Sequence, residues 1–189
     1  SPALANRAMQ LAVPEAPELN LLRVPEVHRE SVRLHDSGTE RHARPLPRLV
    51  RSLQEEGTAL AVGDWVLAAA DLQRETWVHE RVPPLSHIAR RDGDGRRHPV
   101  VSNVDTALLV MGLDDDFNPR RLERYLALVH GDAILPVVVL TKRDVAAPTP
   151  EALDARLDDL RGRIPSHVDI VAVDATQPSA AEALVCYLA

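Results

Sequence analysis

The most constraining feature of this chain is the segment Ile134 to Asp144, ILPVVVLTKRD, an almost continuous apolar run followed by four polar residues. An apolar run without alternation is typical of a strand that is buried on both faces of a parallel sheet, with helices on each side. In such sheets, functional groups gather where the strands end at their carboxyl edge. The tetrapeptide TKRD falls at that edge, and its Lys142 is the only lysine in the chain.

Two interpretations of this tetrapeptide are open from its residues alone. One is a solvated turn after a strand. The other is the guanine-specificity loop of a GTPase, in which the carboxylate of Asp144 accepts two hydrogen bonds from the guanine edge and the stem of Lys142 lies along the base.

Length and composition limit the class of protein. The 189 residues, 45% of them hydrophobic, are enough for one large or two small domains with a core. The single cysteine, Cys186, excludes an internal disulfide framework and a zinc site built from several cysteines of this chain. No apolar run has the length of a membrane span, so we expect a cytoplasmic protein without a membrane partner.

The net charge of -6 is unevenly distributed. The segment from Leu21 to Val100 is nearly neutral and rich in Arg and His, whereas the segment from Val101 onward is acidic. This asymmetry suits a module that faces nucleic acid beside a module that handles a nucleotide.

The first half of the chain predicts a small β-barrel. Residues 1–20 are expected to be a flexible leader, with a short helical stretch around Arg7 to Val13. About five short strands follow up to Val82, interrupted by one long connection from Pro45 to Gly57. This count fits a closed barrel of the oligonucleotide/oligosaccharide-binding (OB) type, and an SH3-like barrel is the alternative that periodicity does not separate. Trp65, at a strand start, is expected in the core.

A charged segment follows the barrel. Pro83 and Pro84 end the barrel, and residues 86–99 are expected to be an exposed linker. Four arginines in this segment are candidates for contact with RNA phosphates, and a solvated linker is the equally open alternative. They are Arg90, Arg91, Arg96 and Arg97.

In the second half the pattern changes to alternating strands and helices. Buried strands are predicted over Val104 to Leu113, in the segment described first and over Val168 to Val173, each followed by a helical stripe. This order implies right-handed crossovers and a parallel sheet. Asp174, Ala175 and Thr176 follow the third strand, so they are expected to meet TKRD at the same edge.

The motifs together resemble the circularly permuted GTPases of the ribosome small-subunit-dependent GTPase A (RsgA) family. The resemblance spans about Leu22 to Thr176, and its motifs stand in the order that the family has. They are VGDWV at 62–66, SHIARR at 86–91, NVDTALLV at 103–110, FNPRRLERYLALV at 117–129 and PVVVLTKRD at 136–144.

The resemblance implies a two-domain architecture, with an all-β OB-fold barrel followed by an α/β parallel sheet. The barrel over 21–85 would bind RNA or the ribosome, and residues 100–189 would form the first part of a circularly permuted P-loop GTPase domain. The family's function is late maturation of the small (30S) ribosomal subunit, with GTP hydrolysis driving release from it. The alternative is a non-catalytic OB protein that binds the ribosome or RNA and carries a vestigial GTPase half-domain.

The resemblance also assigns site residues. GTP or GDP would contact Thr141, Lys142, Asp144, Asp174, Ala175 and Thr176. Thr141 stands where the commoner motif has Asn, which predicts weaker nucleotide binding, and Asp174 stands where Ser is usual. No Gly-rich phosphate-binding loop occurs in the sequence, so we expect a fragment without catalytic or metal-binding residues of its own. Mg²⁺ and a structural Zn²⁺ are expected only with the remainder of the protein. The expected partners are the small subunit and its rRNA, with a monomeric full-length protein. For the fragment, self-association through an open sheet edge is one expectation and partial disorder is the other.

Overall fold

The computed structural model describes residues 2–11, 19–36, 38–93, 97–129, 134–146 and 149–188. The chain forms two compact units, Ser1–Val104 and Asp105–Ala189. No helix in the described ranges is long and apolar enough to cross a membrane.

The first unit contains a closed five-stranded barrel. Its strands are β1 (Asn20–Val27), β2 (Val32–Asp36), β3 (Thr39–Pro45), β4 (Trp65–Ala70) and β5 (Thr76–Arg81), in the spatial order β1-β2-β3-β5-β4. The β3–β5 pair is parallel, whereas the other neighbouring pairs are antiparallel. The barrel is OB-like, as the resemblance predicted. Trp65 is half-buried and packs beside a small apolar cluster outside the main barrel core.

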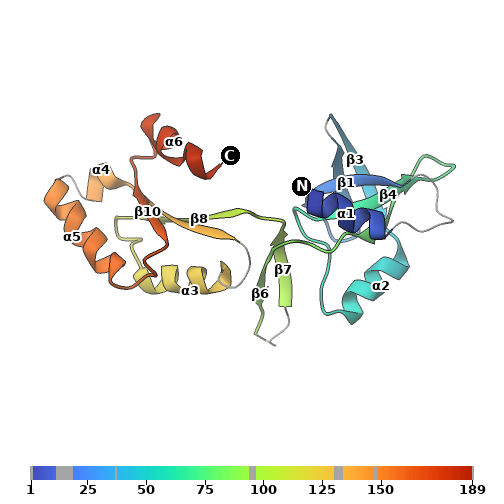
Figure 1. Cartoon of the computed structure of the whole chain (residues 1–189), viewed down its shortest axis with the longest axis horizontal. Coiled ribbons are helices and arrows are strands. Elements are labelled where there is room, and N and C mark those ends of the chain that lie inside the picture. Colours follow the sequence, from blue (N-terminus) through green and yellow to red (C-terminus); the bar gives the residue numbers. More distant parts are fainter. Residues whose placement is uncertain are drawn as a thin grey trace. The chain divides into compact units, whose positions relative to one another are not determined.

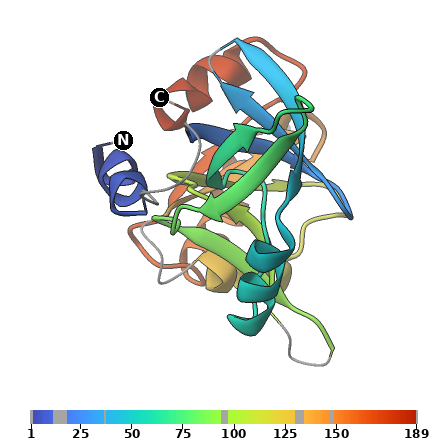
Figure 2. The same cartoon turned by 90° about the vertical axis from the view of Figure 1, so that its right-hand side faces the viewer.

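The connection predicted from Pro45 to Gly57 is wrong in one respect, because it contains helix α2 (Pro47–Glu55). Leu49 and Leu53 lie one turn apart and are buried with the inward residues of the barrel strands. Figure 2 shows α2 at one end of the barrel. Pro47, at the start of the helix, is a favoured residue there, because its missing N–H would be unpaired in any case.

The leader expected over residues 1–20 also needs correction. Residues Pro2–Gln10 form helix α1, whose Leu4 and Ala8 are buried against Leu67 and Val82 of the barrel unit. Arg7 donates from Nη1 to the carbonyl oxygens of Pro83 and Pro84, at 2.8 and 2.6 Å. The helix is therefore fixed to the barrel by apolar contact and by hydrogen bonds.

The expected linker over residues 86–99 is mostly a β-hairpin. Strands β6 (His87–Arg91) and β7 (Arg97–Ser102) are antiparallel, and their tip lies outside the described residues. Ser102 N donates to Val62 O at 2.8 Å, and Asn103 Nδ2 donates to Gly63 O at 2.9 Å. The hairpin is thereby held to the barrel segment that carries the VGDWV motif.

The second unit is a parallel sheet in the order β10-β9-β8. Along the chain it runs β8 (Thr106–Gly112), α3 (Pro119–Val129), β9 (Leu135–Thr141), α4 (Arg143–Ala146), α5 (Pro150–Arg161), β10 (Asp169–Ala172), α6 (Ser179–Leu184) and the 3₁₀ turn η1 (Val185–Tyr187). The predicted alternation of strands and helices is confirmed, with the short helix α4 as an addition.

Strand β9 is buried on both faces, as predicted. Val138 and Leu140 join the core beneath α3 and α5, whereas Val137 and Val139 pack on the opposite face toward α6. Figure 1 shows α3 and α6 on opposite sides of the sheet. Strand β8 differs from the prediction, because it is mostly half-buried and Val110 is exposed. In the described residues β8 pairs on one side only, with β9.

Candidate nucleotide-binding site

The TKRD residues begin at the carboxyl end of β9 and connect it to both neighbouring strands. The carbonyl oxygen of Thr141 accepts from Leu113 N at 3.0 Å, and its Oγ1 donates to Met111 O at 3.4 Å. Arg143 N donates to Val173 O at 3.4 Å, just after β10. Thr141 therefore supports the loop from the β8 side, while Arg143 joins it to the segment that precedes Asp174.

Lys142 occupies a left-handed backbone conformation with φ of 59°, which is uncommon for a residue with a Cβ. Its Nζ forms an ion pair with Oδ2 of Asp114 at a distance of 2.6 Å. This charge-assisted hydrogen bond raises the pKa of Lys142 and lowers the pKa of Asp114. Both side chains therefore stay ionised, and Asp114 is a site residue that the sequence motifs did not identify.

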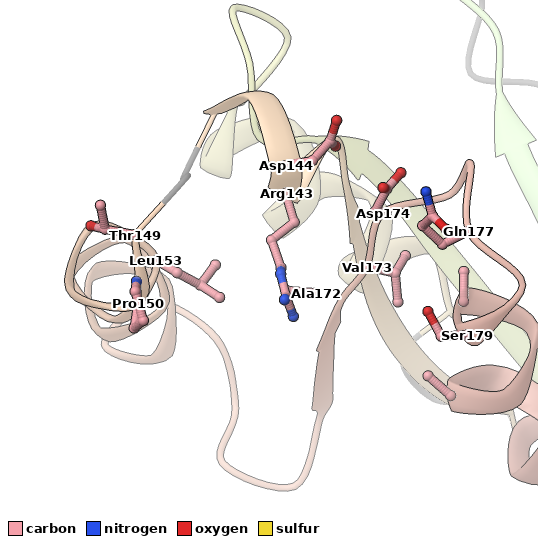
Figure 3. A pocket seen from close by; sticks show the side chains of 12 residues that line it. Arg143, Asp144, Thr149, Pro150, Leu153, Ala172, Val173, Asp174, Gln177 and Ser179 are labelled. Atoms are coloured by element: carbon pink, nitrogen blue, oxygen red, sulfur yellow. The ribbon is translucent and has the colours of Figure 1, made fainter.

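Asp144 lies in the short helix α4 and is exposed. Together with Arg143 and Asp174 it lines a pocket of about 650 Å³. In Figure 3 the carboxylates of Asp144 and Asp174 both point upward, whereas the side chain of Arg143 extends downward, in the opposite direction. The rest of the pocket wall comes from α5, β10, α6 and residues beside them, and it includes Leu153.

Asp174 fixes the turn that follows β10. Its Oδ1 accepts hydrogen bonds from Thr176 Oγ1 at 2.6 Å and from Thr176 N at 2.9 Å. These two bonds lower the pKa of Asp174, the side-chain bond having the larger effect. Ala175, between the two, is exposed. A carboxylate that replaces the usual Ser can thus act as the acceptor of an Asx turn.

The structure brings the predicted residues to one sheet edge but not into one cavity. Asp144 and Asp174 line the pocket, whereas its lining does not include Thr141, Lys142, Ala175 or Thr176. Gln177 lines it as well and was not predicted from the sequence.

Three of the arginines proposed for RNA contact, Arg90, Arg91 and Arg97, lie on the strands of the hairpin. Arg90 and Arg91 are successive exposed residues of β6, so their side chains project to opposite faces. Arg97 is the cross-strand partner of Arg91, and Arg96 lies outside the described residues. Asp92 Oδ2 pairs with His98 Nε2 at 2.7 Å and offsets part of the positive charge.

Among the residues that the structure describes, no group of three or more His, Cys, Asp or Glu side chains could hold a metal ion.

Comparison with curated proteins identifies relatives in Xanthomonas. A protein named small ribosomal subunit biogenesis GTPase RsgA, from Xanthomonas oryzae pv. oryzae (strain MAFF 311018), is 36% identical over 165 residues, which cover 86% of this chain and 43% of that protein. The protein of the same name from Xanthomonas axonopodis pv. citri (strain 306) is 35% identical over 180 residues, covering 94% and 47%. The chain thus spans less than half the length of these relatives.

Two solved structures share the fold. A structure described as YloQ, a circularly permuted GTPase, aligns with a TM-score of 0.61 over 93% of this chain and 58% of that one. The structure of YjeQ from Thermotoga maritima aligns with a TM-score of 0.66 over 90% and 57%. Both are 18% identical to this chain, which supports similarity of fold alone.

A family model described as RsgA GTPase matches residues 79–189, from the end of the barrel through the parallel sheet. This match covers more than half of the chain and includes every predicted nucleotide contact, so the chain belongs to the RsgA GTPase family.

Proposed function

We propose that this chain supplies the guanine-reading part and the RNA-binding barrel of a GTPase that acts in maturation of the small ribosomal subunit. The observation that carries the proposal is the junction of two loops at one sheet edge. Arg143 N donates to Val173 O at 3.4 Å, and Asp144 and Asp174 line one pocket. The names of the Xanthomonas relatives support the same biological role.

Base recognition in this proposal depends mainly on Asp144. An ionised carboxylate offers only acceptors, so it matches the two N–H donors on the Watson–Crick edge of guanine and does not match the adenine edge. The stem of Lys142 covers one face of the base, and Thr141 supports the loop. The backbone N–H of Ala175, an exposed residue in the turn closed by Asp174 and Thr176, donates to guanine O6.

The phosphate chemistry is assigned to the rest of the full-length protein. The 189 residues contain no GxxxxGK[ST] motif, the loop whose backbone N–H groups, lysine and hydroxyl hold the phosphates and Mg²⁺ in P-loop enzymes. We propose that the full-length protein hydrolyses GTP and that hydrolysis releases it from the subunit. We also propose that the chain alone binds guanine nucleotides with a Kd on the order of millimolar, because base contacts barely offset the entropic cost of association.

The decisive experiment replaces Asp144 by Asn in the full-length protein. Asn offers one acceptor and one donor, so its amide opposes the guanine amino group but accepts the carbonyl that xanthine carries there. We expect the nucleotide preference to shift from GTP to XTP. Asp154→Asn is the control, because Asp154 is an exposed residue of α5 and its replacement removes the same charge. It should leave the nucleotide preference unaltered. Unchanged GTP affinity in Asp144→Asn would refute the base-reading role. RNA binding without any nucleotide binding would instead favour the non-catalytic alternative.

A further inference from the structure

The ion pair between Lys142 and Asp114 connects two neighbouring strands at the proposed base-reading edge. Lys142 follows β9 directly, and Asp114 lies two residues beyond the end of β8. Their 2.6 Å contact is short for a pair whose side chains remain 54% and 32% exposed. An exposed lysine without such a partner samples many rotamers, whereas this one is held at its tip.

Asp114 is itself held in place by its surroundings. Its backbone oxygen accepts from Phe117 N at 2.9 Å, and its Oδ1 accepts from Asp116 N at 3.4 Å. The preceding residue, Leu113, is fully buried and is bonded through its N–H to Thr141 O. Arg156 of α5 donates to Leu113 O and lies over the ring of Phe117. The carboxylate therefore projects from an ordered loop.

Gly112 makes room for this arrangement. A Cβ added to it would lie 2.4 Å from Asp114 Oδ1 and 3.5 Å from Lys142 Cδ. The carboxylate and the lysine stem thus pack over the bare Cα at the end of β8. Any larger residue at position 112 would displace the carboxylate from its present position.

From this geometry we infer that Asp114 and Gly112 are positioning elements for guanine recognition: they hold the stem of Lys142 in the orientation in which it covers the base. This inference rests on the proposed function. Asp114 does not touch the nucleotide in this scheme and acts through Lys142 alone. The benefit is preorganisation, because a stem already fixed loses less conformational freedom when the base binds.

The test uses the 189-residue chain and GDP as the probe. Because Lys142 is the only lysine, labelling lysine with ¹³C at Cε gives one side-chain NMR signal that reports directly on this residue. Titration with GDP should shift this signal, and ADP should not. In Asp114→Asn we expect GDP to bind about twofold to tenfold more weakly, the range for one side chain that must be immobilised on binding.

Two further variants make the result specific. Gly112→Ala should weaken GDP binding to a similar extent, because the added methyl group displaces the carboxylate of Asp114 while the backbone can stay in place. Gly162→Ala is its control, because the methyl group added there makes ordinary contacts of 3.6 Å or longer. Asp115→Asn removes the same negative charge one residue away, so it controls for the general loss of negative charge near Lys142. In a Lys142→Met background, Asp114→Asn should have no additional effect, which a merely structural role of Asp114 would not predict.

Each outcome bears on a different claim. No GDP-dependent shift in the wild-type chain would overturn the proposed base-reading function and this inference with it. Normal GDP binding with equal affinity in wild type and Asp114→Asn would overturn the inference alone. Tighter binding in Asp114→Asn would also overturn it, because the ion pair would then compete with the base for Lys142.

Discussion

Replacing Gly63 by Ala should destabilise the barrel unit far more than a typical surface change. Gly63 has a φ of +86°, and an added Cβ would lie 2.0 Å from the backbone oxygen of Ser102. A backbone atom at the end of β7 cannot rotate away as a side chain can, so the two segments must separate. Gly63 therefore permits the close approach of the hairpin to the barrel.

The magnitude follows from the bonds at this junction. A left-handed conformation costs a residue with a Cβ about 1–2 kcal/mol. Separation would also weaken three hydrogen bonds, namely Ser102 N to Val62 O (2.8 Å), Gly63 N to Val24 O (2.8 Å) and Asn103 Nδ2 to Gly63 O (2.9 Å). At about 1 kcal/mol each, the bonds and the strain together predict a loss of roughly 3–5 kcal/mol.

Urea denaturation followed by tryptophan fluorescence measures this loss selectively. The chain has two tryptophans, Trp65 and Trp77, and both belong to the first unit, so the signal reports unfolding of the barrel. A loss of 3 kcal/mol lowers the urea midpoint by about 1–3 M for a domain of this size.

Gly57→Ala is the matched control for this experiment. Gly57 also has a positive φ, +68°, but an added Cβ would meet nothing within 4 Å. This variant should lose only the conformational contribution, about 1 kcal/mol or less after the reduced entropy of the unfolded chain is included. Equal losses in Gly57→Ala and Gly63→Ala would show that the close approach to Ser102 contributes nothing, and would refute the reasoning.

Three other predictions concern pH, salt and catalysis. Burial raises the pKa of Asp64 above the usual value of an aspartate carboxyl, so the folded state holds the proton more tightly than the unfolded state, and stability is lost as the pH rises through this range. The stability of Asp64→Asn relative to wild type should therefore rise between pH 4 and pH 7, and a pH-independent difference would contradict this. Binding of small-subunit rRNA to the chain should weaken at least tenfold between 50 and 200 mM salt, as about two phosphate contacts require, and salt-insensitive binding would argue against arginine–phosphate contact. The 189-residue chain should release no phosphate from GTP above background, with or without small subunits, since the loops proposed to read the base supply none of the groups that stabilise the transferred phosphoryl. Subunit-stimulated phosphate release would contradict that proposal.

The parallel sheet was predictable from the sequence because its signals are long and consistent. A strand with an almost unbroken apolar run has apolar side chains on both faces, so both faces favour burial. In the structure, the two faces of β9 belong to two different hydrophobic clusters. The capped helix starts at Asn118 and Thr149 were equally readable, and the Oδ1 and Oγ1 of these residues accept from Arg121 N and Ala152 N.

The errors in prediction have a common physical cause, which is that tertiary contact decides short or polar segments. Helix α2 buries only Leu49 and Leu53, and helix α1 only Leu4 and Ala8, so neither has a periodic stripe long enough to stand out. The hairpin formed by β6 and β7 is rich in arginine and has no clear hydrophobic pattern. Its strands are instead held by their pairing with each other and by a backbone hydrogen bond to Val62.

The place of the candidate residues at one sheet edge was predictable from the sequence, but their contacts were not. Spacing placed TKRD and Asp174 at one edge, as the structure does. The partner of Lys142 could not be predicted, because Asp114, Asp115 and Asp116 are equivalent in sequence and only the loop after β8 selects one of them. The bond that Thr176 N donates to Asp174 Oδ1 follows a known local pattern, in which an Asx side chain accepts from the backbone two residues later, and could have been anticipated.

The solitary lysine also makes the chain unusually simple for covalent chemistry. An amine-acylating reagent has a single side-chain target, Lys142, at the edge where the base is proposed to bind. Acylation needs the neutral amine, and the bond to Asp114 raises the pKa of Lys142, so the modification should be slow at neutral pH and faster whenever the pair opens. The rate at which the product acylated at Lys142 forms, measured by mass spectrometry of the peptide that contains it, therefore reports how often this one contact opens. A light-activated crosslinker attached to Lys142 would form a covalent bond with molecules that approach the edge where the base is proposed to bind.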